Sequence, residues 1–234
     1  MPIGYYGYSD STLILVMIGV VLSLLASSGV KRTFAKYAKV ASASGMTGAE
    51  VALKLLHSQG IYDVTVEAVS GDMTDHYDPR TKTVRLSESV YHRASVAALG
   101  VAAHECGHAI QDNAGYVPLR LRSAFVPVAS FGSRLAWPMV LFGLIIGLTP
   151  FIHIGIWMYV LAVLFQIITL PVEFNASSRA IRMLDGTGMM PAGEVSGASK
   201  VLRAAALTYV AAAAASILQL LRLIILSGGR RRRG

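Results

Sequence analysis

The sequence predicts a multi-span α-helical membrane protein that also carries a small α+β region with a short β-sheet. Hydrophobic residues make up 54% of the 234 residues and charged residues only 15%, whereas roughly a quarter of a soluble domain is charged. Four apolar runs have about the 20 residues that a helix needs to cross a bilayer. Between them, at 31–127 and 172–203, the chain is polar and mixed in charge, which predicts structure outside the hydrocarbon.

The net charge of +8 is unevenly placed, because five of the 21 basic residues lie between 222 and 233. In a chain with so little other charge, we interpret these residues as interfacial and topological charge. We therefore expect a lipid bilayer as a partner and no nucleic acid. The single cysteine, Cys106, excludes a disulfide within the chain.

The first apolar run, 11–30, follows an N-terminal tail at 1–10 and predicts a transmembrane helix. A cleaved signal peptide is the alternative, but it would need positive charge before the run. The preceding residues contain Asp10 and no Lys or Arg. We therefore expect a retained anchor helix.

Residues 31–127 are expected to form the α+β region. Its first helix is predicted at 48–58, because Thr47 and Glu50 form a capping box at the start and Gly60 provides a stop.

Two extended segments follow this helix. The alternating, β-rich stretch IYDVTVEAV predicts a strand, and DHYDPRTKTVRLS predicts two short arms around a turn at 78–81. A longer helix is then predicted at about 95–111.

The second half of the chain returns to the membrane. Two runs, 128–149 and 150–171, predict a transmembrane hairpin joined through GLTPF. A polar segment at 172–203 leads to a fourth predicted span at 204–226, and a basic tail follows at 227–234.

The helix at 95–111 carries HECGH, the motif that indicates a chemical function. His104 and His108 are four residues apart and share a helix face, so both imidazoles can bind one ion, and Glu105 follows the first histidine. Zinc peptidases hold Zn²⁺ with such a pair and use the glutamate to take a proton from a bound water. Chance would place this motif in roughly one chain in a hundred of this size, so two surface histidines on an ordinary helix are the weaker interpretation. We predict one Zn²⁺ per chain.

A catalytic zinc ion has three protein ligands and a water, so a third ligand is required. His153, the only later histidine, is expected at the far end of the membrane hairpin. Two spans return the chain to the side of the motif near Pro171, and Glu173 is the first acidic residue there, on a helix predicted to start near Val172. We predict Glu173 as the third ligand; the alternative is an N-terminal acid that stabilises the helix dipole.

Three segments, TDHYDPRTKTVRLS, AALGVAAHECGHAIQ and PVEFNASSRA, together resemble the YugP-like family of neutral zinc metallopeptidases of bacterial membranes. The resemblance covers about 45–226 and implies protease activity in a zincin-like catalytic region. The arrangement is also similar to larger membrane zinc proteases, in which two spans separate the motif from a helix that bears a glutamate ligand. Those proteases usually have an acidic residue four positions after the ligand, where this chain has Ser177.

Other polar residues are candidates for supporting roles. A transition state with an oxyanion needs a hydrogen-bond donor opposite the zinc, and the candidates are Arg179, Tyr209 and His76. Asn175 and Asp185 are alternative acceptors that could orient the ligand histidines.

The strand before the motif helix is a candidate for substrate binding. In zincin folds an edge strand pairs with the substrate backbone, and the stretch Thr83, Val84, Arg85 and Leu86 is suitably placed. A purely structural hairpin is the equal alternative. Cys106 lies two positions from each ligand histidine and is expected to turn away from the metal.

These observations lead to the hypothesis of an integral-membrane zinc endopeptidase with Glu105 as general base and a membrane-associated polypeptide as substrate. The alternative is a non-catalytic membrane adaptor or scaffold, in which a fourth protein ligand would replace the water. Positive charge after the first span and around the motif places the active site on the cytoplasmic side of the cell membrane, although the Arg230–Arg233 tail opposes that orientation. No sequence feature indicates an oligomer or a regulatory partner.

Overall fold

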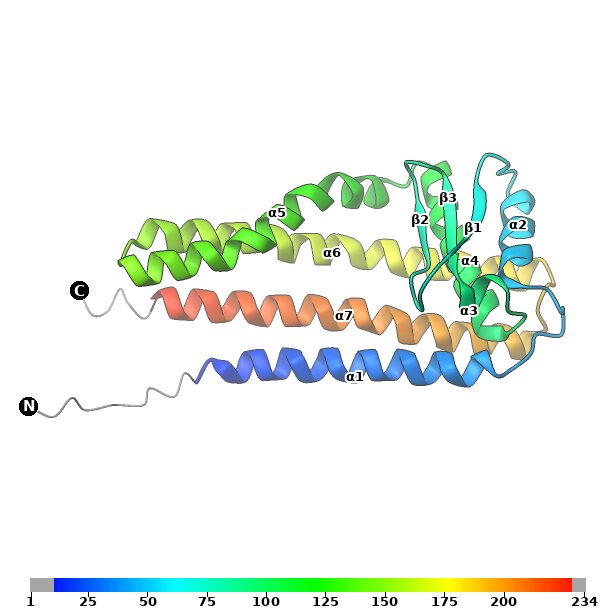
Figure 1. Cartoon of the computed structure of the whole chain (residues 1–234), viewed down its shortest axis with the longest axis horizontal. Helices are drawn as coiled ribbons and strands as arrows, with labels where there is room; N and C mark the ends of the chain where they lie inside the picture. Colours follow the sequence, from blue (N-terminus) through cyan, green and yellow to red (C-terminus); the bar gives the residue numbers. More distant parts are fainter. Residues whose placement is uncertain (1–10, 229–234) are drawn as a thin grey trace, which may run out of the picture.

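The structure, a computed structural model, describes residues 11–228. Long helices lie side by side, and a small sheet with shorter helices packs at one end of them (Figure 1). This arrangement confirms the predicted fold class of a multi-span helical protein with a small α+β region. The predicted tail at 1–10 and the Arg230–Arg233 segment lie outside the described residues.

Within residues 11–228, four helices are long and apolar enough to cross a membrane. They are α1 (Leu13–Ala38), α5 (Val117–Ile146), α6 (Thr149–Gly186) and α7 (Ala192–Gly228). In the most apolar window of each helix, only 11 to 28% of the residues are buried inside the protein. The other residues of these windows are partly or fully exposed, as the surface of helices in contact with lipid would be.

These helices extend beyond the predicted spans. A separate helix was expected from Val172, but α6 continues from the membrane hairpin through Pro171 without a break. Proline removes one backbone hydrogen bond from a helix, and apolar helices tolerate that loss when neighbouring groups compensate. As a consequence, Glu173 lies inside a long continuous helix rather than at a helix start.

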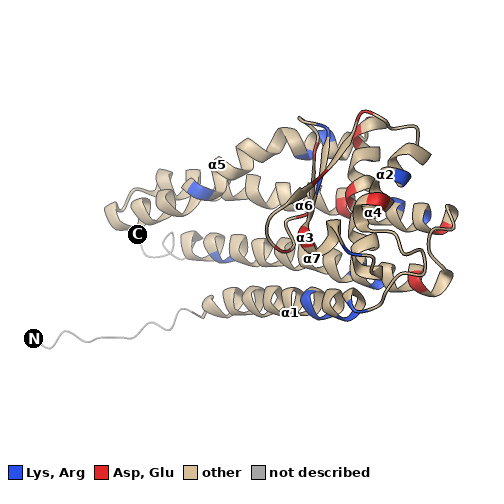
Figure 2. Cartoon of the chain, turned by 45° about the vertical axis from the view of Figure 1, so that its right-hand side comes forward, with Lys and Arg blue, Asp and Glu red and all other residues tan. Residues whose placement is uncertain are grey.

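Charged residues are concentrated at the end of the molecule that carries the sheet, and most of the remaining length of the helices is free of them (Figure 2). The start of α1, the α5–α6 turn and the end of α7 all lie at the opposite end (Figure 1). A charge at the centre of a bilayer costs about 2.5 kcal/mol or more, so this separation is the distribution that membrane insertion favours.

The α+β region begins with α2 (Gly48–Ser58), which has the predicted bounds and the predicted capping box. The Thr47 hydroxyl accepts from the Glu50 N–H at 3.3 Å, and the Glu50 carboxylate accepts from the Thr47 N–H at 2.8 Å. The short helix α3 (Glu88–Tyr91) and the motif helix α4 (Val96–Asn113) follow the strands.

The sheet has the strand order β1-β3-β2. β3 (Thr83–Ser87) pairs with β1 (Thr65–Val69) in parallel and with β2 (His76–Asp78) in an antiparallel hairpin. The edge position expected for residues 83–86 is therefore wrong. Val84 and Leu86 are completely buried, which suits a central strand, and β1 and β2 form the two edges.

Candidate metal centre

The motif helix α4 lies in the interior of the charged end, where 14 of its 18 residues are buried. Glycines allow the long helices to approach it. A Cβ atom on Gly107 would lie 2.6 Å from the backbone oxygen of Ala176 on α6, and one on Gly100 would lie 3.1 Å from the Ala198 side chain on α7. Because Ala176 follows Glu173 by about one helical turn, the contact at Gly107 brings Glu173 to the motif.

His104, His108 and Glu173 converge, with all their ligand atoms within 4.8 Å of one another. Glu173 Oε2 lies 3.3 Å from His104 Nε2 and 3.7 Å from His108 Nε2. Two ligand atoms held about 2.1 Å from a tetrahedral zinc ion are roughly 3.4 Å apart. The three side chains therefore fit a zinc ion in both chemistry and spacing.

Each histidine uses its other ring nitrogen for a contact within the protein. His104 Nδ1 lies 3.1 Å from the Ser177 hydroxyl, and His108 Nδ1 lies 3.0 Å from Gln111 Oε1. Gln111 is completely buried and donates its amide to the backbone oxygen of Val172 at 2.8 Å. These contacts fix the ring orientations and leave both Nε2 atoms for a metal.

The carboxylate of Glu173 divides its two oxygens between different partners. Oε2 faces the histidines, whereas Oε1 accepts from Arg122 Nη1 of α5 at 3.0 Å. The Glu173 side chain is only 2% exposed, and a buried carboxylate requires such partners. The Arg122 contact therefore holds Glu173 in the orientation that a metal ligand needs.

A cavity of about 250 Å³ lies beside the three converging side chains. Its wall includes Glu105, Arg122, Tyr209 and the edge strand β2. Burial raises the pKa of the Glu105 carboxyl, which favours its protonated form in the metal-free protein.

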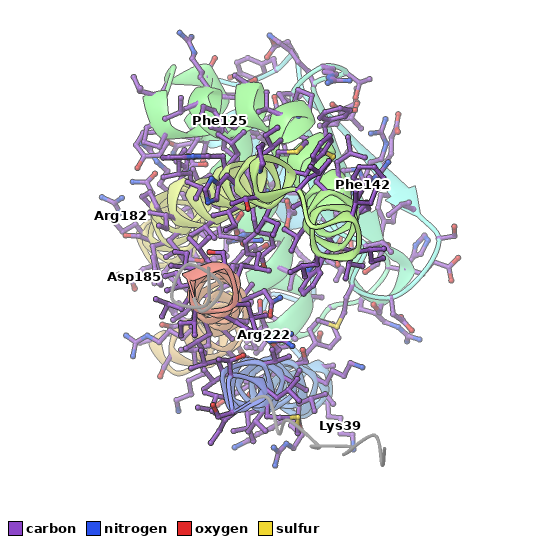
Figure 3. All side chains as sticks on the ribbon, turned by 90° about the vertical axis from the view of Figure 1, so that its left-hand side faces the viewer. Lys39, Phe125, Phe142, Arg182, Asp185 and Arg222 are labelled. Atoms are coloured by element: carbon purple, nitrogen blue, oxygen red, sulfur yellow. The ribbon has the colours of Figure 1, made fainter. Side chains whose placement is uncertain are left out.

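Of the predicted supporting residues, His76 and Tyr209 line this cavity, whereas Arg179 lies on a different surface cleft. The Arg179 Nε donates to Asn175 Oδ1 at 2.8 Å, and Asn175 also accepts from Gln111 at 3.0 Å. Asn175 is thus linked through Gln111 to His108, a candidate ligand. Asp185 is exposed near the end of α6, beside Arg182 (Figure 3).

The residues 83–86 are absent from the lining of the cavity, and β2 takes the place expected for them. The Tyr77 hydroxyl attaches β2 to the motif helix by donating to Asp112 at 2.9 Å. Cys106 is buried with its sulfur 3.5 Å from the Ala52 carbonyl oxygen, directed away from the histidines as predicted.

Sequence reasoning missed two contributors to the site. Gln111 follows His108 by three positions, a spacing that places both on one helix face and could have indicated the contact. Arg122 had no such signal, because its contact with Glu173 depends on the direction of α5 relative to α4. The chain turns there at Gly115, whose φ of +62° favours glycine.

A pair of histidines on one helix with a glutamate from a second helix is the arrangement typical of zinc-metallopeptidase centres, and here it lies at one end of a bundle of candidate membrane helices. The chain belongs to the family described as "Putative neutral zinc metallopeptidase", whose family model matches residues 12–228. It is similar to "Putative membrane protease YugP" of Bacillus subtilis (strain 168), with 50% identity over 190 residues, or 81% of this chain and 84% of that protein. No solved structure matches the chain with statistical significance.

Proposed function

We propose that this protein is an integral-membrane zinc endopeptidase with one catalytic zinc site per chain. The observation that carries the proposal is the spacing of the ligand atoms of His104, His108 and Glu173, at 3.3 and 3.7 Å, beside a cavity. Three protein ligands are typical of catalytic zinc, which keeps a fourth position for water or substrate, whereas structural sites use four. This difference favours the enzyme over the adaptor or scaffold.

When bound, zinc activates a water molecule and polarises the carbonyl of the scissile peptide. Glu105 faces the same cavity, and its carboxylate is proposed to accept the proton of that water and to deliver it to the leaving amine. Tyr209 and Arg122, in the cavity wall, are the proposed donors to the oxygen on which negative charge develops.

The substrate is proposed to be an extended polypeptide segment that binds along β2. This strand has one neighbour in the described sheet, and His76, Tyr77 and Pro79 line the cavity beside the ligands. Pairing with a strand edge uses backbone hydrogen bonds and depends little on the amino-acid sequence of the substrate. Because the cavity lies near the apolar helices, membrane-proximal or unfolded segments are the expected substrates.

The active site is proposed to face the cytoplasm from the cell membrane. Lys31, Arg32 and Lys36 lie in the last part of α1, at the end that carries the metal centre, whereas the connection at 147–148 carries no charge. Positive charge is retained on the cytoplasmic side of bacterial membranes.

The decisive variant is Glu105→Gln, which keeps the size of the side chain and removes the base. We expect zinc to remain bound while cleavage of an unfolded protein substrate falls by roughly 10²-fold or more. Glu88→Gln is the matched control, because Glu88 is exposed on α3, outside the cavity. Unchanged cleavage by the Glu105 variant would exclude the mechanism.

Metal content tests the ligand set separately. Glu173→Ala is expected to lose zinc on purification, whereas Glu88→Ala should retain it. X-ray absorption spectroscopy of the zinc-bound protein should detect three protein ligands and a light-atom ligand from solvent. A fourth protein ligand would instead favour the scaffold.

A further inference from the structure

A second cleft, of about 580 Å³, lies between α6 and α7. Much of its wall is apolar, with Phe174, Ile181, Leu202 and Leu207 among the lining residues. Serines and two arginines complete the lining, and no acidic residue within 11–228 belongs to it. The cleft therefore combines an apolar surface with positive charge.

The two arginines come from the two helices that form the cleft. Arg182 belongs to α6 and Arg203 to α7, and both are exposed. Figure 3 shows Arg182 on the outer flank of the helices. Its Nε donates to the Ser178 carbonyl oxygen at 3.3 Å. Among residues 11–228, neither arginine forms an ion pair with a carboxylate. Their charge is thus available to an anion from outside the chain.

The cleft also lies at the level where the chain changes from apolar to polar. Arg203 directly precedes the fourth predicted span, 204–226, and Phe174 follows the third, 150–171. Phe174 and Leu207 are both substantially exposed, at 49% and 59%. An occupant of this cleft therefore meets positive charge on one side and the edge of the hydrocarbon on the other.

We propose that this cleft binds an anionic phospholipid, with its phosphate at Arg182 and Arg203 and an acyl chain against Phe174 and Leu207. Guanidinium groups match phosphate oxygens in geometry and charge. Basic pockets between membrane helices recognise anionic headgroups for the same reason. This lipid site is separate from peptide cleavage, although Ser177 lines the cleft while its hydroxyl contacts His104.

The test measures binding of labelled phosphatidylglycerol to the full-length, zinc-loaded protein in phosphatidylcholine nanodiscs. The double variant Arg182→Gln/Arg203→Gln should bind the lipid at least about tenfold more weakly, because two charge-assisted contacts are lost. Lys31→Gln/Lys36→Gln removes the same charge from α1 and should change binding by less than about twofold. Unchanged binding by the arginine variant, or an equal loss in the lysine control, overturns the proposal.

A second variant tests the cleft without removing charge. Ser178 is exposed and lines the cleft, so Ser178→Trp should fill it and reduce binding while both arginines remain. Zinc content serves as the folding control for every variant. Inorganic phosphate distinguishes the lipid from a free anion: it should not displace the labelled lipid at millimolar concentration. Displacement by phosphate, or full binding by Ser178→Trp, would contradict a phospholipid site.

Discussion

The hydroxyl of Ser177 lies 3.1 Å from Nδ1 of His104, and Ser177 follows Glu173 by one turn of the same helix. One face of α6 therefore presents both a candidate metal ligand and the group that orients a second ligand on α4. In larger membrane zinc proteases of similar arrangement this position is usually acidic, and a hydroxyl occupies it here. A neutral partner fixes the ring orientation without adding negative charge beside the metal.

Ser177→Ala is expected to weaken zinc binding by about 10-fold or more, because His104 loses the group that holds its ring. Ser177→Asp should retain zinc at least as firmly as the wild type, because a carboxylate can accept from the same nitrogen. Competition with a chelator measures both variants. Equal zinc affinity in the alanine variant and the wild type would show that the Ser177 contact has no orienting role.

Arg122→Gln tests the contact that holds the other oxygen of Glu173. The variant leaves a nearly buried carboxylate without its cationic partner, and we expect zinc affinity to fall by several-fold or more. Arg120→Gln makes the same change at an exposed position of the same helix and should leave zinc binding unaltered. The chelator assay gives both values, and equal effects at the two positions would argue against the proposed role of Arg122.

The parts of this site that sequence could predict are those encoded by local spacing. The capping box at Thr47 and Glu50 defined α2, and the four-residue spacing of His104 and His108 defined the motif face. The position of Glu173 beside the motif could also be predicted, because two spans of known minimum length return the chain to one side of a membrane. None of these predictions required knowledge of how distant segments pack.

The strand order and the Arg122 contact depend on packing between segments distant in sequence. No pattern in the sequence predicted them. Residues 83–86 were expected to form an edge strand because they precede the motif helix, yet the parallel pairing of β1 with β3 places them at the centre. A helix start was expected near Val172, but α6 passes through Pro171 without a break. Contacts between segments that are distant in sequence determine the strand order and the course of α6.

Gly107→Ala tests the close packing that brings Glu173 to the motif. The new Cβ would lie 2.6 Å from the Ala176 backbone oxygen, so α6 must shift. We expect a loss of about 1–3 kcal/mol in stability together with reduced zinc content. Gly186→Ala is the control, because a Cβ there has no neighbour within 4 Å in the described structure. Thermal unfolding in detergent and metal analysis check both variants, and a neutral Gly107→Ala would contradict the packing argument.

Two aspartates of the α+β region should contribute to folding stability with opposite signs near neutral pH. Burial raises the pKa of Asp75, despite the hydrogen bonds that it accepts from Ser87. Its ionised form therefore costs stability near neutral pH, and the cost disappears as the pH falls through the raised pKa. Asp75→Asn should unfold at a higher temperature than the wild type at about pH 7, with the difference shrinking towards about pH 4.

Asp63 provides the matched comparison. Its hydrogen bond with Lys82 lowers the pKa of the Asp63 carboxyl, so the contribution of Asp63 to stability is present above its unfolded pKa and is lost on acidification. Asp63→Asn should therefore be less stable than the wild type at about pH 7, and this difference should also shrink towards about pH 4. Differential scanning calorimetry of the two variants measures the signs. The same sign for both at neutral pH would refute the assignment of burial as the dominant influence on Asp75.

The orientation of the protein can be tested with single cysteines in a Cys106→Ala background. Arg80 lies in the exposed turn between β2 and β3, near the metal centre, and Leu148 lies in the α5–α6 connection at the opposite end, where it is 45% exposed. If the active site faces the cytoplasm, a membrane-impermeant maleimide should label Leu148→Cys in cells whose outer surface is accessible, and should label Arg80→Cys only after permeabilisation. Because two ends of one helix bundle are compared, each variant controls for the other. The reverse labelling pattern would place the site outside and would mean that the basic residues of α1 do not determine the topology.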